Sequence, residues 1–184
     1  MGADMQWLMS FAGKYPTLDI VAIFFAEYIG YIVVIIFGIA LLLKQDVRYR
    51  LHIIFISGLS VILSMGIIRA ALNYFFFRPR PFVAYNIVPL IPHEATASFP
   101  SGHATFFFTL ATLIFLFMSR RWGMWAYAIA ALIGIARVYG GVHYPLDIIG
   151  GAAIGIISPF LVRMLVPLES APSLSSRATT RDPE

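Results

Sequence analysis

The chain has 184 residues, of which 60% are hydrophobic and only 12% are charged, with a formal net charge of +4. Because a soluble domain carries about 25% charged residues, this composition indicates an integral membrane protein. The basic residues occur in short clusters between apolar runs, which argues against nucleic-acid binding. The sequence contains no cysteine, so disulfide bonds and thiolate metal sites are excluded.

Five apolar stretches are long enough to cross a bilayer as helices, which takes about 20 residues. We predict these spans at residues 18–43, 50–76, 102–118, 123–140 and 145–167, the third being the shortest. Together they form one all-α membrane domain, residues 18–167. The short apolar segment in residues 1–17 is interpreted as an interfacial helix, and residues 168–184, rich in Ser, Pro, Thr and Arg, as a disordered tail. A cleavable signal peptide begins with a basic segment, but the first thirteen residues contain no Lys or Arg. We therefore expect span one to be retained.

Clusters of basic residues predict how the spans are oriented. They lie between spans one and two, between spans three and four, and after span five: Lys44, Arg48 and Arg50; Arg120 and Arg121; Arg163, Arg177 and Arg181. All three clusters fall on one side, which the positive-inside rule makes cytoplasmic, together with the tail. The outer side then receives the end of span two, the start of span three and the connection between spans four and five.

The end of span two carries Asn73, followed by Arg78-Pro-Arg80-Pro. The two prolines interrupt helical hydrogen bonding and favour an extended path. Arginine presents planar donors that match phosphate oxygens, so Arg78 and Arg80 are candidate ligands for an anionic substrate. The alternative is that both arginines anchor a helix end among lipid headgroups.

Span three opens with Ser101-Gly102-His103. Ser101 is a good helix N-cap, and Gly102 lets a ligand approach the backbone, so the free N–H groups of the first turn could hold an anion. His103 is placed to protonate a leaving oxygen. The alternative is a capped helix that starts with an interfacial histidine.

The connection between spans four and five contains Arg137, His143 and Asp147. His143 and Asp147 are four residues apart across a helix start, so the carboxylate can hydrogen-bond one ring nitrogen and leave the other free to attack phosphorus. The alternative is that Asp147 only satisfies the helix N-terminus while His143 contacts headgroups. The three motifs share one side of the membrane, and together they supply the groups needed for phosphoryl transfer through a histidine. With a single carboxylate among several arginines, we expect neither a metal ion nor another cofactor.

These motifs resemble the signature of the type 2 phosphatidic acid phosphatase superfamily: Lys-x6-Arg-Pro, Pro-Ser-Gly-His, and Ser-Arg-x5-His-x3-Asp. The second motif is complete at residues 100–103. In the third, Ala136 replaces the serine, and in the first, Asn73 replaces the lysine. The first motif therefore lacks one phosphate-binding charge, which Arg78, or Arg69 one helical turn before Asn73, could supply.

The resemblance implies that His143 is the nucleophile, Asp147 its orienting partner and His103 the acid that protonates the leaving group. It also implies a set of phosphate-binding residues: Arg80, Ser101, Gly102 and Arg137. Within the superfamily, the stretches at residues 90–100 and 141–147 resemble the bacitracin-resistance type of undecaprenyl-diphosphatase. That branch recycles the cell-wall (peptidoglycan) lipid carrier on the outer side of the bacterial cytoplasmic membrane.

We therefore expect a multi-pass membrane enzyme that hydrolyses undecaprenyl diphosphate through a phosphohistidine and binds membrane lipids but no nucleic acid. One alternative substrate is phosphatidic acid or phosphatidylglycerol phosphate. An alternative of another class, suggested by Asn73 and Ala136, is a non-catalytic protein that binds or transports lipid phosphates. An oriented nucleophile argues against it, because binding alone needs none. The sequence does not indicate an oligomeric state.

Two ionisable residues, Glu27 and Arg69, are predicted to lie well inside spans one and two. Glu27 is roughly 12 Å deep in span one at 1.5 Å per residue, and Arg69 lies at a similar depth in span two. Because either charge alone is costly there, we predict an ion pair between them at the floor of the site, which would leave Arg69 only partly available to phosphate. The alternatives are a protonated Glu27 or a Glu27 that lines a wet cleft. His93 and Glu94, in the long outer loop, are interpreted as solvated.

Overall fold

The computed structural model describes residues 12–167, and the elements in that range are all helical. Residues 1–11 and 168–184, which hold most of the predicted interfacial helix and the predicted tail, lie outside the described residues. Span one consists of α2 (Pro16–Ile23), the π-helical segment η1 (Phe24–Tyr28) and α3 (Ile29–Leu42). Span two consists of α4 (Val47–Val61), the π-helical segment η2 (Ile62–Arg69) and α5 (Ala70–Phe75).

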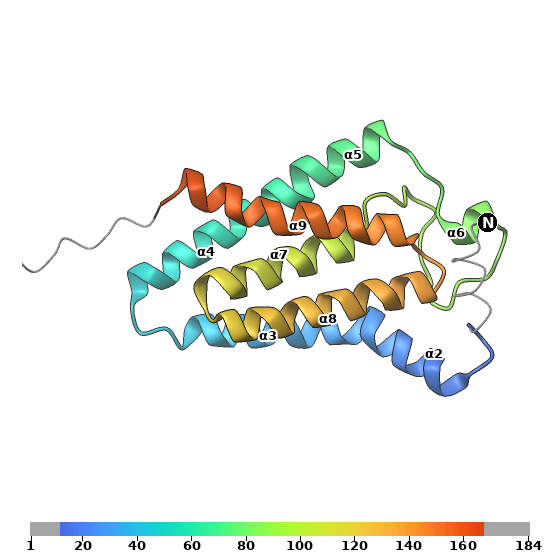
Figure 1. Ribbon diagram of the computed structural model, residues 1–184, viewed down its shortest axis with the longest axis horizontal. Coiled ribbons are helices and arrows are strands. Elements are labelled where there is room, and N and C mark those ends of the chain that lie inside the picture. The colour runs from blue at the N-terminus through green and yellow to red at the C-terminus, as the bar shows by residue number, and fades with distance from the viewer. Residues whose placement is uncertain (1–11, 168–184) are drawn as a thin grey trace, which may run out of the picture.

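The rest of the bundle is built by α7 (Gly102–Phe117), α8 (Arg120–Tyr139) and α9 (Pro145–Leu165), with a short α6 (Pro81–Ala84) in the long loop. These bounds confirm the five predicted helices to within a few residues. Within the described residues, four of the five predicted spans are helices long and apolar enough to cross a membrane, and α7 is the exception. At 16 residues α7 is the shortest, as predicted, and it lies between α8 and α9 (Figure 1). A helix surrounded by protein need not match the bilayer thickness by itself.

Small residues bring α7 and α9 into close contact, and this contact positions the functional site. A Cβ atom on Gly155 would lie 2.5 Å from the Thr105 carbonyl oxygen, and one on Gly151 would lie 2.7 Å from the Ser101 carbonyl oxygen. Membrane helices pack through such small residues, because lipid removes the hydrophobic driving force between helices. The first turns of α7 and α9 are therefore held side by side.

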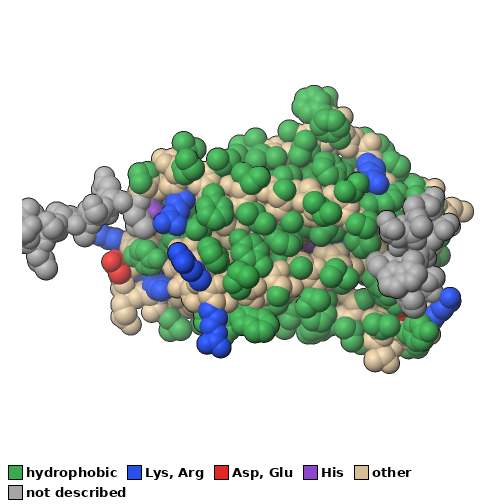
Figure 2. All heavy atoms as spheres, viewed as in Figure 1, with side chains coloured by type: hydrophobic (Ala, Val, Ile, Leu, Met, Phe, Trp, Pro, Cys, Tyr) green, Lys and Arg blue, Asp and Glu red, His purple; other side chains and the backbone are tan. Residues whose placement is uncertain are grey.

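The two ends of the bundle differ in charge. The connections from α3 to α4 and from α7 to α8, and the last turn of α9, lie at one end (Figure 1). Lys and Arg side chains gather there on the face shown in Figure 2. The described members of the three predicted basic clusters thus share one end, whereas Arg177 and Arg181 lie outside the described residues. The opposite end holds the first turns of α7 and α9, the last turn of α8 and the loop from residue 76 to residue 101.

Candidate active site

The start of α7 is a capped helix terminus with free N–H groups. The Ser101 hydroxyl accepts from the Ala104 N–H at 3.5 Å, and the Ser101 N–H donates to the Asp147 carbonyl oxygen at 3.0 Å. Within the described residues, the N–H groups of Gly102 and His103 have no backbone acceptor. Two donors at the positive end of a helix dipole are thus available to an anion. Ser101 positions this turn, and its direct contact with phosphate stays a prediction.

His143 and Asp147 are brought together as the spacing predicts. Both side chains are fully buried, and Nδ1 of His143 lies 3.5 Å from Oδ2 of Asp147. On the other side of the ring, Nη1 of Arg80 lies 3.1 Å from Nε2. Arginine can only donate, so Nε2 accepts and the ring proton sits on Nδ1, facing the carboxylate. The lone pair of Nε2 therefore points to the side of the site where Arg80 lies.

The protonation state of His143 suits a nucleophile. Burial lowers the pKa of His143 to about 4, against the opposing effect of the hydrogen bond to Asp147. The ring is thus neutral at neutral pH, and a neutral imidazole is the form that can attack phosphorus.

Ser98 is a site residue that the sequence analysis missed. Its hydroxyl donates to Oδ2 of Asp147 at 2.5 Å and lies 3.5 Å from Nδ1 of His143, so it bridges the two groups. Ser98 comes from the long loop, in which no periodic pattern marks one hydroxyl above another. The only sequence feature that marks Ser98 is its position two residues before the second motif begins.

Arg80 is buried beside His143, as a phosphate ligand should be. Its guanidinium donates to the Val142 carbonyl oxygen at 3.1 Å and to the Thr96 hydroxyl at 3.2 Å. Burial, and then the neighbouring charges of Arg137 and Arg69, lower the pKa of Arg80 to about 10. It is still a cation at neutral pH, and a bound anion would relieve the repulsion among the three arginines.

Arg78, a predicted phosphate ligand, is paired with Asp147 in the structure. Its Nη1 is 3.2 Å from Oδ1 of Asp147, and its guanidinium lies over the Tyr144 ring at 3.7 Å from the centroid. The Tyr144 N–H donates to the same carboxylate at 2.8 Å. Asp147 is thus held by Arg78, Ser98 and a backbone N–H, and the charge of Arg78 is used to fix the carboxylate.

The predicted ion pair between Glu27 and Arg69 is wrong. Glu27 instead accepts from Nη1 of Arg137 at 2.7 Å, since η1 packs against α8. The Arg137 side chain is only 2% exposed, whereas Glu27 is 41% exposed. Counting residues along a helix gives depth but not the direction in which a side chain points, and η1 and η2 do not pack extensively on each other. Phosphate binding by Arg137 stays a prediction.

The pair of Glu27 and Arg137 is expected to couple in stability. Removing the carboxylate of Glu27 leaves a buried guanidinium unpaired. Glu27→Gln should therefore lower the free energy of unfolding of the wild type by at least about 1 kcal/mol more than it lowers that of the Arg137→Gln variant. Thermal unfolding of the two single variants and the double variant in detergent measures this coupling. The cycle of Glu27→Gln with Arg69→Gln is the control, and it should be additive within about 0.5 kcal/mol. Additivity of the Glu27 and Arg137 variants would contradict the pairing.

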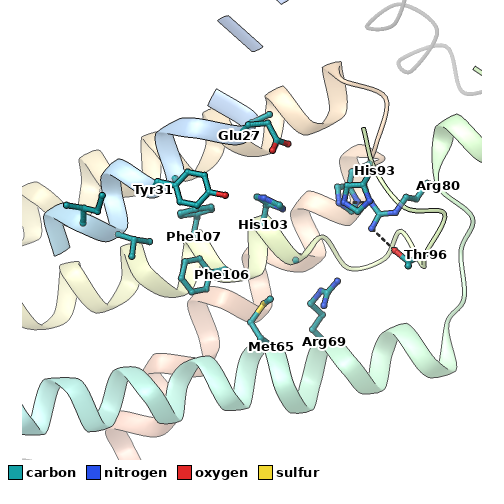
Figure 3. A pocket seen from close by; sticks show the side chains of 16 residues that line it. Glu27, Tyr31, Met65, Arg69, Arg80, His93, Thr96, His103, Phe106 and Phe107 are labelled. Atoms are coloured by element: carbon teal, nitrogen blue, oxygen red, sulfur yellow. Dashed lines mark hydrogen bonds between the residues drawn. The ribbon is translucent and has the colours of Figure 1, made fainter. Parts of the chain in front are cut away.

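These groups open onto a cavity of about 640 Å³ between span one, η2 and α7. Its polar and charged lining residues, which make up its polar end, are Glu27, Arg69, Arg80, His93, Thr96, His103 and His143. All of these except His143 are labelled in Figure 3. His93 is therefore not a solvated loop residue, and its ring lies edge-on to that of His143, with 6.3 Å between centroids. Burial and the charge of Arg80 lower the pKa of His93. Asn73 is not among the residues that line this cavity. Its side chain is therefore not placed to bind a phosphate there, as the lysine of the first motif would.

The other end of the cavity is apolar and runs along the bundle. It is lined by Tyr31, Val34, Ile35, Met65, Phe106 and Phe107. A second apolar groove of about 430 Å³ shares Val34 and Phe106 with it and continues between α3 and α4 over α7. The described residues thus combine a cationic end with a long apolar extension, which suits a lipid with a phosphate headgroup.

The fold and this site define a membrane phosphatase that acts on lipids. Residues 53–169 match the PAP2 superfamily, and the chain belongs to that superfamily. It is 35% identical over 158 residues to the bacitracin transport permease protein BcrC of Bacillus licheniformis, covering 84% of this chain and 74% of that one. It is 34% identical over 146 residues to the undecaprenyl-diphosphatase BcrC of Bacillus subtilis, covering 78% and 72%.

Other similar proteins include a solved structure and a relative named for a different lipid. The crystal structure of Aquifex aeolicus LpxE superimposes with a TM-score of 0.69 at 28% identity and covers 87% of this chain and 92% of that chain. Phosphatidylglycerophosphatase B of Bacillus subtilis is 34% identical over 120 residues, which are 58% of this chain and 57% of that one. Proteins similar to this chain thus carry the names of different lipid substrates, so similarity alone does not identify the lipid on which this chain acts.

Proposed function

We propose that the protein hydrolyses undecaprenyl diphosphate to undecaprenyl phosphate and inorganic phosphate, through a phosphohistidine on His143 and without a metal ion. The observation that carries this proposal is the orientation of the His143 ring: Nδ1 faces Asp147 while Nε2 faces Arg80 at the polar end of the cavity. A binding protein would have no need of a neutral imidazole held in one tautomer.

In the first step, Nε2 of His143 attacks the terminal phosphorus and the bond from phosphorus to the bridging oxygen breaks. Arg80 and the N–H groups of Gly102 and His103 stabilise the charge on the equatorial oxygens, with Arg137 as a further cation. The imidazolium of His103 gives its proton to the bridging oxygen, so that the lipid leaves as a monophosphate.

In the second step, a water molecule attacks the phosphorus of the phosphohistidine. His103, now neutral, takes a proton from that water, and the bond between phosphorus and Nε2 breaks. Inorganic phosphate leaves, and both histidines return to their starting states. His143 thus serves as the nucleophile and His103 serves first as the acid and then as the base, while Asp147 holds the proton on Nδ1 of His143 throughout.

The apolar extension of the cavity supports a lipid with a long hydrocarbon chain. Val34 and Phe106 line both the cavity and the adjoining groove, so a chain that starts at the polar end can continue between α3 and α4. The position of the basic clusters, interpreted by the positive-inside rule, supports a polar end on the outer side of the cytoplasmic membrane. Residues 18–167 are then the phosphatase domain, and the lipid carrier of the cell wall is the substrate.

The second candidate substrate is phosphatidylglycerol phosphate, because a relative that carries that activity in its name matches part of the chain. Its phosphate would use the same polar end. Its two acyl chains would occupy the groove differently from a single polyprenyl chain.

Phosphate release by the purified protein in excess EDTA tests the proposal. We expect a kcat/KM for undecaprenyl diphosphate at least about tenfold above that for phosphatidylglycerol phosphate or phosphatidic acid. The His143→Ala protein is the control for contaminating phosphatases. A preference for either glycerolipid would move the substrate assignment, loss of activity in EDTA would contradict the metal-free mechanism, and no release from any of the three would favour the binding protein.

A further inference from the structure

The structure shows why a cation at position 73 would be poorly placed. Asn73 lies in α5, which directly continues η2 and has no extensive contact with another described helix, and α5 diverges from α9 toward its C-terminal end (Figure 1). The Asn73 side chain does not line the cavity. By contrast, η2 packs against both α7 and α9, and Arg69 is the last residue of η2.

Arg69 reaches the start of α7 from this position. A Cβ atom built on Gly102 would lie 3.1 Å from both Cζ and Nε of Arg69, so the guanidinium lies directly against the backbone of Gly102. Arg69 lines the cavity together with His103 and Arg80, and in Figure 3 its side chain projects from η2 into the same space.

The guanidinium of Arg69 has no ion-pair or hydrogen-bond partner among the described residues. Glu27, its predicted partner, binds Arg137, and Asp147 binds Arg78. Nε of Arg69 is buried without a hydrogen-bond partner. An unpaired guanidinium beside two free N–H groups at a helix N-terminus is a site that an anion would complete.

We propose that Arg69 binds the phosphate of the substrate and supplies the charge that the lysine of the first motif would otherwise provide. It clamps the phosphate against the N–H groups of Gly102 and His103, opposite Arg80. The Arg69 side chain starts one helical turn deeper than position 73, at the end of η2, which packs on α7. A Cβ atom at position 102 would press against the guanidinium, which would have to move by a few tenths of an ångström.

This inference rests on the proposed function for its substrate, but binding of inorganic phosphate tests it separately. Arg69→Gln is expected to raise the dissociation constant of inorganic phosphate, measured by calorimetry, and the KM for the lipid substrate by roughly 10- to 100-fold each. The fall in kcat should be smaller. Arg69→Lys should recover most of the loss, because it keeps the charge. Arg121→Gln, at the opposite end of the bundle, is the matched control with unchanged binding.

Two further variants keep the test decisive if Arg69→Gln folds poorly. Gly102→Ala keeps the charge but shifts the guanidinium by a few tenths of an ångström, so it should weaken phosphate binding, by less than Arg69→Gln does. Asn73→Lys should not restore binding to Arg69→Gln, because α5 diverges from the site. Unchanged phosphate binding in folded Arg69→Gln, or full rescue by Asn73→Lys, would overturn the inference. If the wild type prefers another lipid, only the proposed substrate fails, since phosphate binding does not depend on the lipid.

Discussion

Replacing His143 by alanine is expected to lower phosphate release by roughly four orders of magnitude or more, because the nucleophile of the reaction is lost. Nε2 of His143 faces Arg80 at the polar end of the cavity, and no other described imidazole is held against a carboxylate in this way. Incubation of the wild type with substrate labelled in its terminal phosphate should also leave label on the protein. The quench must be alkaline, since phosphohistidine is labile in acid.

His143→Asn is the matched variant for this experiment. The His143 side chain is fully buried, so alanine leaves a cavity that can destabilise the protein. Asparagine fills more of this space and can still face Asp147, but it has no nucleophilic ring nitrogen. Both variants should retain the binding of inorganic phosphate through Arg80 and the α7 N–H groups. Activity within tenfold of the wild type in either variant, or label that persists in His143→Asn, would contradict the assignment of the nucleophile.

Asp147→Asn is expected to lower kcat by roughly 10²- to 10⁴-fold with a much smaller change in KM. The carboxylate faces Nδ1 of His143 and stabilises the positive charge that develops on the ring as Nε2 attacks phosphorus. Asp147 does not line the cavity, so it acts through His143 and not on the substrate directly. Steady-state kinetics that separate kcat from KM, together with thermal unfolding, measure the two effects.

Arg78 and Ser98 provide the controls for Asp147, because each contacts the same carboxylate. Arg78→Gln and Ser98→Ala should each lower kcat less than Asp147→Asn does, since the charge of the carboxylate is kept. Combining either of them with Asp147→Asn should add little further loss, as expected for residues that act through one group. A large rise in KM with unchanged kcat in Asp147→Asn would indicate that Asp147 binds substrate, which the geometry does not support.

The helices and the grouping of the motifs could be predicted from the sequence, because both depend on local chemistry. Long apolar runs form helices in a bilayer, and glycine, proline and N-cap residues mark where they start and end. Basic residues between alternate spans then indicate which ends share a side of the membrane. His103, His143 and Asp147 could be named for the same reason: their partners lie within a few residues or at a helix start.

The partners of the arginines were decided only by the tertiary structure. Arg78 pairs with Asp147, Arg137 pairs with Glu27, and Arg69 lies against Gly102. Depth along a span can be counted from the sequence, but the direction of each side chain depends on how α7 packs between its neighbours and on the π-helical turns of η1 and η2. The position of Ser98 depends on the path of a loop without periodicity, and the apolar groove on the separation of α3 from α4. These contacts join residues far apart in the chain, so no local pattern in the sequence specifies them.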